Sequence, residues 1–261
     1  MLILRINKSL FLNRIKCIAE LIFNFKDCKI RLVNSKNIVS QIIIVGPESL
    51  GILIITSCFI GIIFTLQIIK EFIYLNASNF VGAILSIAFM RELSPVLTAI
   101  ILTGRVSSAF TAELATMKVT EQIDALYLLR INPLLYLILP RLIACFFMLP
   151  WLNLLFFITS LSSSIFICSI FYYIYPSSFL NSVFISLSYA DFFKSTCKVL
   201  IFSFVISVIS CLWGLTTDGG AKNVGLSTTS SVVTILLLIF ILDCILTHLL
   251  FKHVSSIIRF L

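Results

Sequence analysis

The sequence predicts an all-α integral membrane protein with about five transmembrane helices. Of its 261 residues, 60% are hydrophobic and only 11% are charged, whereas soluble globular domains carry about 25% charged residues. The mean hydropathy is +1.14. A helix needs roughly 20 apolar residues to cross the bilayer core, and the chain offers such runs repeatedly. We therefore expect a basic N-terminal segment, residues 1–46, followed by one membrane domain, residues 47–261.

The N-terminal segment is interrupted by charges too early to form the unbroken apolar region of a secretory signal. Wound as a helix, it places most of its apolar residues on one side and most of its basic residues on the other. This pattern predicts an amphipathic helix lying on the inner leaflet. A loosely ordered basic tail is the alternative.

The apolar runs predict where the membrane spans lie. Four of them fit single crossings: Leu50–Ile69, Phe80–Thr103, Val199–Leu215 and Val232–Phe251. The remaining run, Leu142–Ile174, would be about 50 Å long as a helix, which exceeds a simple crossing. Pro150 could kink it, so this run is either one long helix or a broken pair.

The distribution of lysine and arginine predicts the orientation. The first 46 residues hold eight of them, the first connection holds only Lys70, and residues 103–141 hold four. Cytoplasmic segments are enriched in these residues. The N-terminus and residues 103–141 are therefore expected in the cytoplasm, and five spans place the C-terminus outside.

A charged pair interrupts the second span. Arg91 and Glu92 stand about 12 residues into it, where each charge costs roughly 2.5–3.5 kcal/mol. Neighbours on a helix point about 100° apart, so each residue needs another partner, a wet cavity or a ligand. Pro95 adds to this need because it lacks an N–H and crowds the carbonyl of Arg91. A substrate path is the functional interpretation, and a structural salt bridge to another helix is the alternative.

Small residues follow the charged pair. Gly104, Ser108 and Ala112 are four apart, which predicts a ridge that lets helices approach closely. Packing within the chain is the simplest explanation, and a subunit interface is the other.

Residues 120–130 form the most charged stretch between two spans. Thr120 suits an N-cap, Glu121 and Asp124 suit the positive start of a helix, and Arg130 suits its end. The apolar stripe of this helix is Ile123, Leu126, Leu129 and, less regularly, Leu128. We expect a short cytoplasmic helix that either lies on the membrane or docks into a soluble partner.

The stretch RELSPVLTAIILTGRVSSAFTAELATMKVTEQIDAL, residues 91–126, closely resembles the MlaE-type permease family of ABC transporters. The elements REL, GR, AEL and TEQIDAL occur in the family's order and spacing. A second stretch, GLTTDGGAKNVGLSTTSSVV at 214–233, resembles the loop before the family's last span. Two departures stand out: Ser94 replaces a usual glycine, and Leu226 and Ser230 stand where the family often has arginines.

The resemblance implies a permease that moves lipid, expected to be phospholipid, between the inner membrane and the outer envelope. Family members occur in the bacterial inner membrane and in chloroplasts, and for this chain we expect the bacterial inner membrane. It implies a homodimer, an ATPase bound through a coupling helix at 120–130, and an MCE-domain protein on the outer face. A STAS-domain protein is a further candidate partner. The family's buried glutamate falls on Glu92, which implies that Glu92, with Arg91 and Pro95, lines a lipid cavity between the two permeases.

The residues agree with a subunit that depends on a separate ATPase, because the chain has no GxxxxGK[ST] phosphate loop. We expect no catalytic residues, metal, cofactor or nucleic acid. One rival is an ion-coupled secondary transporter that uses Arg91, Glu92 and Asp243 as a relay, although such carriers usually contain internal repeats. A membrane enzyme and a purely structural anchor are weaker rivals. The particular lipid, its direction and the partner subunits do not follow from the sequence.

Overall fold

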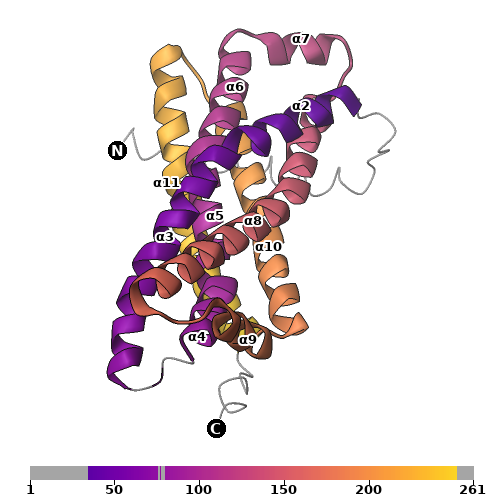
Figure 1. Ribbon diagram of the computed structural model, residues 1–261. Helices are drawn as coiled ribbons and strands as arrows, with labels where there is room; N and C mark the ends of the chain where they lie inside the picture. The colour runs from indigo at the N-terminus through magenta and orange to yellow at the C-terminus, as the bar shows by residue number, and fades with distance from the viewer. Residues whose placement is uncertain (1–34, 76, 78–79, 252–261) are drawn as a thin grey trace. The chain divides into compact units, whose positions relative to one another are not determined.

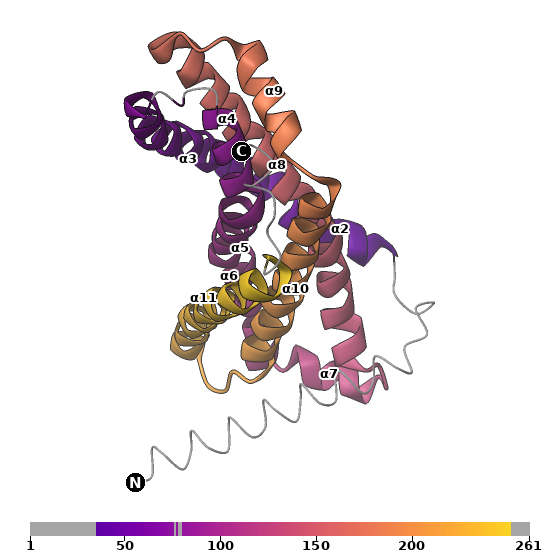
Figure 2. The same ribbon diagram turned by 90° about the horizontal axis from the view of Figure 1, so that it is seen from below.

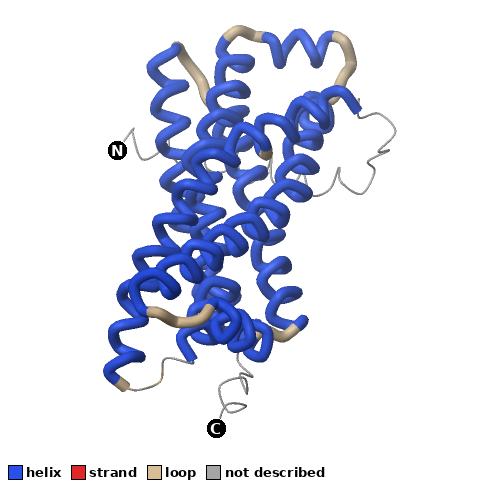
Figure 3. Tube along the Cα trace, in the orientation of Figure 1, coloured by secondary structure: helices blue, strands red, loops and turns tan. Residues whose placement is uncertain are grey.

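The computed structural model describes residues 35–75, 77 and 80–251, and these residues form helices joined by short loops (Figure 3). Five helical segments are long and apolar enough to cross a membrane, which confirms the expected count. They are Ser35–Tyr74, Val81–Val119, Tyr136–Tyr172, Tyr189–Leu215 and Ala221–Phe251. The N-terminal amphipathic helix of the sequence analysis lies outside the described residues.

The first two segments are built from consecutive shorter helices (Figure 1). Helices α2 (Ser35–Val45) and α3 (Pro47–Tyr74) make the first. The second runs through α4 (Val81–Ala88), the π-helix η3 (Phe89–Leu93), α5 (Ser94–Leu102), the π-helix η4 (Thr103–Ser107) and α6 (Ser108–Val119). Its 39 residues correspond to about 58 Å of helix, so it extends beyond a bilayer core of about 30 Å.

The later elements decide one alternative that the sequence left open and correct two other expectations. After α7 (Gln122–Leu128) and the π-helix η5 (Leu134–Ile138), helix α8 (Leu139–Tyr172) continues unbroken through Pro150, so the long apolar run is one helix. Helix α9 (Pro176–Ser186) follows, and α10 (Tyr189–Leu215) begins ten residues earlier than its apolar run. Helix α11 (Ala221–Phe251) includes most of the stretch that resembled a loop.

The chain divides into two compact units, and the first contains the described residues 35–48, 102–148 and 202–239. Its hydrophobic cluster joins α6, η5 and α10 through Leu114, Ile138, Cys211 and Leu212. Gly214 permits this packing, because a Cβ there would lie only 2.5 Å from the Cβ of Leu114. Arg105 forms an ion pair with Glu48 at 2.6 Å and so ties η4 to the start of α3.

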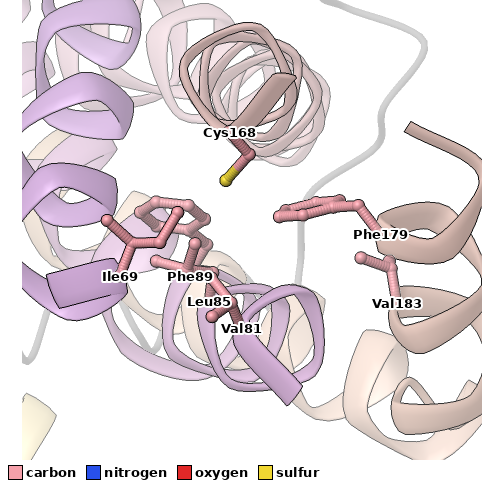
Figure 4. Close-up of a cluster of buried hydrophobic side chains, with 7 residues drawn as sticks. All are labelled: Ile69, Val81, Leu85, Phe89, Cys168, Phe179 and Val183. Atoms are coloured by element: carbon pink, nitrogen blue, oxygen red, sulfur yellow. The ribbon is translucent and has the colours of Figure 1, made fainter. Parts of the chain in front are cut away.

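The second unit contains residues 49–101, 149–201 and 240–251 of the described chain. Its core cluster consists of Ile69, Val81, Leu85, Phe89, Cys168, Phe179 and Val183 (Figure 4). Helix α9 lies alongside α4 (Figure 2). Gly82 allows this approach, since a Cβ there would stand 2.8 Å from the carbonyl oxygen of Phe179. Small residues at such contacts bring helices close together, as is usual in membranes.

Candidate functional site

The π-helix η3 presents the charged pair, and Pro95 determines its local backbone. The N–H of Ser94 donates to the carbonyl of Phe89, five residues back. Because Pro95 has no N–H, the carbonyl of Arg91 lacks its usual helical donor. Lys198 of α10 supplies the replacement, with its Nζ 3.1 Å from the Arg91 oxygen. The polar group that the sequence predicted to be freed is therefore satisfied from another helix.

Arg91 is paired with Asp191, at the start of α10. Its Nε and Nη2 lie 3.0 and 2.9 Å from the same carboxylate oxygen, Oδ1. The other oxygen accepts a hydrogen bond from the hydroxyl of Ser188 at 2.8 Å. The Arg91 guanidinium also lies 5.1 Å from the ring centre of Phe251, which the ammonium of Lys194 approaches to 5.4 Å. Both side chains of the Arg91–Asp191 pair are nearly buried.

Lys198 is the centre of the second group of charges, and its side chain is 0% exposed. Its Nζ lies 2.9 Å from Glu92 Oε2, 2.6 Å from Asp243 Oδ1 and 2.9 Å from Thr247 Oγ1. The hydroxyl of Thr247 donates in turn to Glu92 at 3.0 Å. An ammonium has three N–H donors, yet four oxygens, including the Arg91 carbonyl, surround this one. One lysine therefore serves two carboxylates.

The two groups form one charge cluster: Arg91, Glu92, Asp191, Lys198 and Asp243. With both basic residues charged and all three carboxylates ionised, its net charge is −1. Buried ion pairs lose hydration that their attraction regains only with good geometry, and here each charge has a partner within 3 Å. The side chain of Glu92 is nevertheless 39% exposed. The cluster is thus internally paired, and a polar molecule could reach it at Glu92.

A second set of polar contacts joins Ser94, the residue that follows η3, to neighbouring helices. The hydroxyl of Ser94 donates to the side-chain oxygen of Asn153 at 2.6 Å, and the Asn153 amide donates to Ser195 at 3.4 Å. All three residues are buried. The serine that replaces the family's usual glycine thus links α5 to α8 and, through Asn153, to α10.

In the structure Arg91 pairs with Asp191 and Glu92 pairs with Lys198. Salt bridges to another helix were the structural alternative to a substrate path. Sequence reasoning missed those partners. The fourth span predicted from hydropathy begins at Val199 and so leaves out Lys194 and Lys198, but both lie inside α10. A signal was present, because Asp191, Lys194 and Lys198 are spaced three and four residues apart and so share one helix face. Asp243 was named only for the rival transporter.

The expected helix at 120–130 exists but is shorter, spanning Gln122–Leu128. The predicted N-cap role of Thr120 is wrong, because its hydroxyl donates back to the carbonyl of Thr116 at 2.8 Å and so belongs to the end of α6. Left-handed residues bracket α7: Glu121 has φ 59° and Arg130 has φ 56°. Asp124, in its first turn, pairs with Lys118 at 3.2 Å.

The apolar residues of α7 divide between two sides. Ile123 is buried and Leu126 is half-buried, so they hold the helix against the chain. Tyr127, Leu128 and Leu129 are exposed, and Leu128 reaches 88%. An exposed apolar tip on a segment that the charge pattern assigns to the cytoplasm is unusual unless it meets a partner or a membrane surface.

Among the described residues, the small-residue ridge is open at Gly104 and only partly covered at Ser108 and Ala112. Gly104 is exposed, and nothing lies within 4 Å of a Cβ built on it. Ser108 and Ala112 are half-buried. The buried side of the same helix instead carries Ser107 and Thr111, whose hydroxyls lie 3.1 and 2.9 Å from that of Ser231.

Residues 38–249 match the family described as Permease MlaE. The chain belongs to the MlaE permease family. It is 50% identical over 246 residues to the probable ABC transporter permease protein ycf63 of Pyropia yezoensis, covering 94% of this chain and 92% of that protein. It is 49% identical over 220 residues to the probable ABC transporter permease protein slr1045 of Synechocystis sp., covering 84% of each.

A third relative of this MlaE permease is the Arabidopsis thaliana protein TRIGALACTOSYLDIACYLGLYCEROL 1, chloroplastic. It is 44% identical over 220 residues, which are 84% of this chain and 63% of the Arabidopsis protein. The chain is therefore a multi-pass membrane subunit of an ABC transporter. It is a permease rather than an enzyme, and an ATPase partner follows from that class. The family assignment also sets aside the ion-coupled secondary transporter.

Proposed function

We propose that this MlaE permease moves a phospholipid or a related glycerolipid between its own membrane and the outer envelope, driven by a separate ATPase. The observation that carries the proposal is the family membership, joined to the 44% identity with a relative named after a galactosyl diacylglycerol. A lipid has a polar head and long apolar tails. Helices that are apolar along most of their length, with one charge cluster reachable at Glu92, suit both parts.

In this proposal Arg91, Glu92 and Pro95 shape the polar part of the lipid cavity. Glu92 supplies the accessible carboxylate, since its side chain is 39% exposed although it is paired with Lys198. Arg91 acts indirectly, because Asp191 neutralises it. Pro95 acts through the backbone, where it leaves the Arg91 carbonyl to Lys198. The charge pairs mean that the cluster is stable without cargo, so the lipid would compete for Glu92 rather than fill an empty charge site.

The ATPase is proposed to bind at α7. Its Leu128, Leu129 and Tyr127 form an exposed apolar tip, and its base is held by Ile123 and by the Lys118–Asp124 pair. A short helix fixed at its base and apolar at its tip can enter a groove of a soluble subunit.

We propose three further partners: a second copy of this chain, an MCE-domain protein on the outer face and a STAS-domain protein. The exposed ridge of Gly104, Ser108 and Ala112 is the surface assigned to the second copy, because small residues let helices of two subunits approach. The membrane is proposed to be the bacterial inner membrane or its counterpart in the chloroplast. The N-terminus lies in the cytoplasm or stroma, so a C-terminal tag should be reachable only from the opposite side.

The proposal is tested by extracting the complex through a tagged permease and reconstituting it in vesicles of phosphatidylcholine and phosphatidylglycerol. ATP should drive movement of fluorescent phosphatidylglycerol or galactosyl diacylglycerol, measured by its accessibility to dithionite. Collapse of the proton gradient at constant ATP should leave the rate unchanged. Transport that needs the gradient but not ATP, or a complex without an ATPase, would refute the proposal.

A further inference from the structure

Arg141 lies in the first turn of α8 and is buried, with its side chain 2% exposed. Its Nη2 is 2.8 Å from Oε2 of Glu113, which lies on α6 and is 41% exposed. The guanidinium stands 5.5 Å from the ring centre of Phe110, also on α6. One buried cation on α8 therefore holds two residues of α6.

The pairing of this arginine is incomplete. Nε and Nη1 of Arg141 are buried and have no hydrogen-bond partner among the described residues. A buried charge is costly unless it is paired and hydrogen-bonded, and an unsatisfied donor costs about 1–3 kcal/mol. Arg141 is one of the four basic residues in 103–141 that predict a cytoplasmic location for that segment. The charge cluster around Lys198 does not involve it. A costly residue outside the proposed cargo site needs a separate explanation.

The position of the pair supplies that explanation. Helix α7 and its loops lead from the end of α6 at Val119 to the start of α8 at Leu139, and Figure 1 shows α7 lying across the ends of these two helices. Glu113 and Arg141 close the base of this segment, which we call the coupling hairpin, residues 113–141. The hydrophobic cluster that includes Leu114 and Ile138 joins the same two arms: Leu114 follows Glu113 directly, and Ile138 lies three residues before Arg141.

We propose that the Arg141–Glu113 pair is a clamp that makes the coupling hairpin transmit movement of α7 to α6 and α8 together. This inference rests on the proposed binding of the ATPase at α7. Without the clamp, a displacement of α7 can be absorbed by separation of the two arms at their base. With it, both arms move as one. Arg141 is a positioning residue in this scheme and touches neither ATP nor lipid.

The two unsatisfied nitrogens are consistent with an arginine that pairs differently in different conformations of the coupling hairpin. Glu113 pairs with Nη2, so Nε and Nη1 could bind other oxygens in a second arrangement of the arms. A clamp with two such arrangements would carry coupling between sites, because packed interfaces are bistable rather than continuously deformable.

The test compares lipid moved per ATP hydrolysed in reconstituted complexes, using fluorescent phosphatidylglycerol. Arg141→Gln should keep the ATPase attached and hydrolysing ATP while the lipid-to-ATP ratio falls at least about fivefold, the lower end of typical coupling effects. Arg141→Lys should restore part of the ratio, because it restores the charge. Arg105→Gln is the matched control: it breaks the Arg105–Glu48 pair of the same unit, and the ratio should stay at the wild-type value.

The outcomes separate this inference from the proposed function. A wild-type complex without ATPase or transport refutes the proposed function itself. An assembled Arg141→Gln complex with the wild-type ratio overturns the clamp alone. If the single variant fails to assemble, the double variant Glu113→Gln/Arg141→Met removes both charges, a change that buried pairs often tolerate. Its ratio should fall equally, and a normal ratio or failure to assemble would make the pair merely structural.

Discussion

At the scale of single residues, Lys198 is the least replaceable member of the charge cluster. It neutralises Glu92 and Asp243 and also donates to the Arg91 carbonyl, to which Pro95 cannot donate because it has no N–H. Loss of Glu92 would leave Lys198 paired with Asp243. Loss of Lys198 would leave two carboxylates and a carbonyl facing one another without a cation. The two changes should therefore differ sharply in their effect on folding.

We predict that Lys198→Met lowers the free energy of unfolding by about 3–5 kcal/mol, as expected when one partner of a buried pair is removed. Glu92→Gln should cost clearly less, because it keeps the side-chain shape and leaves a balanced Lys198–Asp243 pair. Thermal unfolding of both purified variants in the same detergent measures the difference. Equal destabilisation by the two variants would contradict the conclusion that Lys198 neutralises both Glu92 and Asp243.

The need for partners at Arg91 and Glu92 could be predicted from the sequence, since charges and a proline coincide in an apolar run. Their identities could not be predicted in the same way. Asp191 lies 100 residues away and Asp243 is farther still, so the pairing depends on how α10 and α11 pack. Lys198 was placed outside the membrane because hydropathy alone starts the fourth span at Val199, whereas buried ion pairs allow charged residues inside a membrane helix.

At the scale of elements, α7 is defined by its two left-handed neighbours. Arg130 follows the helix with φ 56°. The N–H of Ile131 donates to the Leu126 carbonyl at 3.0 Å and that of Arg130 to Tyr127 at 2.9 Å. This is the hydrogen-bond pattern of a Schellman C-cap, a position that favours glycine. Only glycine adopts such a conformation without a steric cost.

Arg130→Gly should therefore stabilise the protein by up to about 1 kcal/mol, the order of the left-handed penalty for a residue with a Cβ. The gain should appear as a small rise in the melting temperature. Arg130→Ala is the control, because it removes the same charge but keeps the Cβ and should give no rise. A lower melting temperature for the glycine variant would contradict the cap assignment.

Leu128→Glu should detach the ATPase, because it places a charge at the most exposed apolar position of α7. Co-purification through a tagged permease measures the loss, and Leu128→Met is the control that keeps an apolar side chain. The folded fraction should be unchanged, since Leu128 is 88% exposed. Full retention of the ATPase by Leu128→Glu would refute α7 as the coupling helix.

The existence of α7 could be predicted from its charges and its Pro133 stop, but its first residue could not. Thr120 has the composition of an N-cap, yet a threonine hydroxyl can equally donate to the carbonyl four residues back. In the structure it does so at the end of α6. Whether Thr120 caps α7 or belongs to α6 depends on where α6 ends, and helix propensity alone does not determine the last residue of α6.

At the scale of the whole molecule, five spans follow from hydropathy because the bilayer sets their minimum length. Their full lengths do not follow from hydropathy, since charged residues such as Asp191, Lys194 and Lys198 join helix α10 once packing provides them with partners. The ridge at Gly104 is the surface proposed for a second copy of the chain. No described residue lies within 4 Å of a Cβ built at Gly104, and small residues in membrane helices commonly pack against another helix.

Gly104→Trp should weaken the homodimer, because the indole would fill the space that a second copy is proposed to occupy. Native mass spectrometry of the extracted permease should show a higher share of monomer. Gly51→Trp is the matched control, since Gly51 of α3 is equally open and lies outside the ridge. An unchanged dimer for Gly104→Trp would remove the ridge from the interface.

In the proposed transport, the charge cluster opens to cargo at Glu92, and ATP hydrolysis in a partner subunit drives the lipid past it. The most direct measurement is ATP-driven lipid transport by reconstituted Glu92→Ala complexes, beside Glu71→Ala as an exposed-carboxylate control on α3. We predict an assembled Glu92→Ala complex that hydrolyses ATP but moves almost no labelled lipid, and normal transport by Glu71→Ala. Wild-type transport by an assembled Glu92→Ala complex would contradict the account.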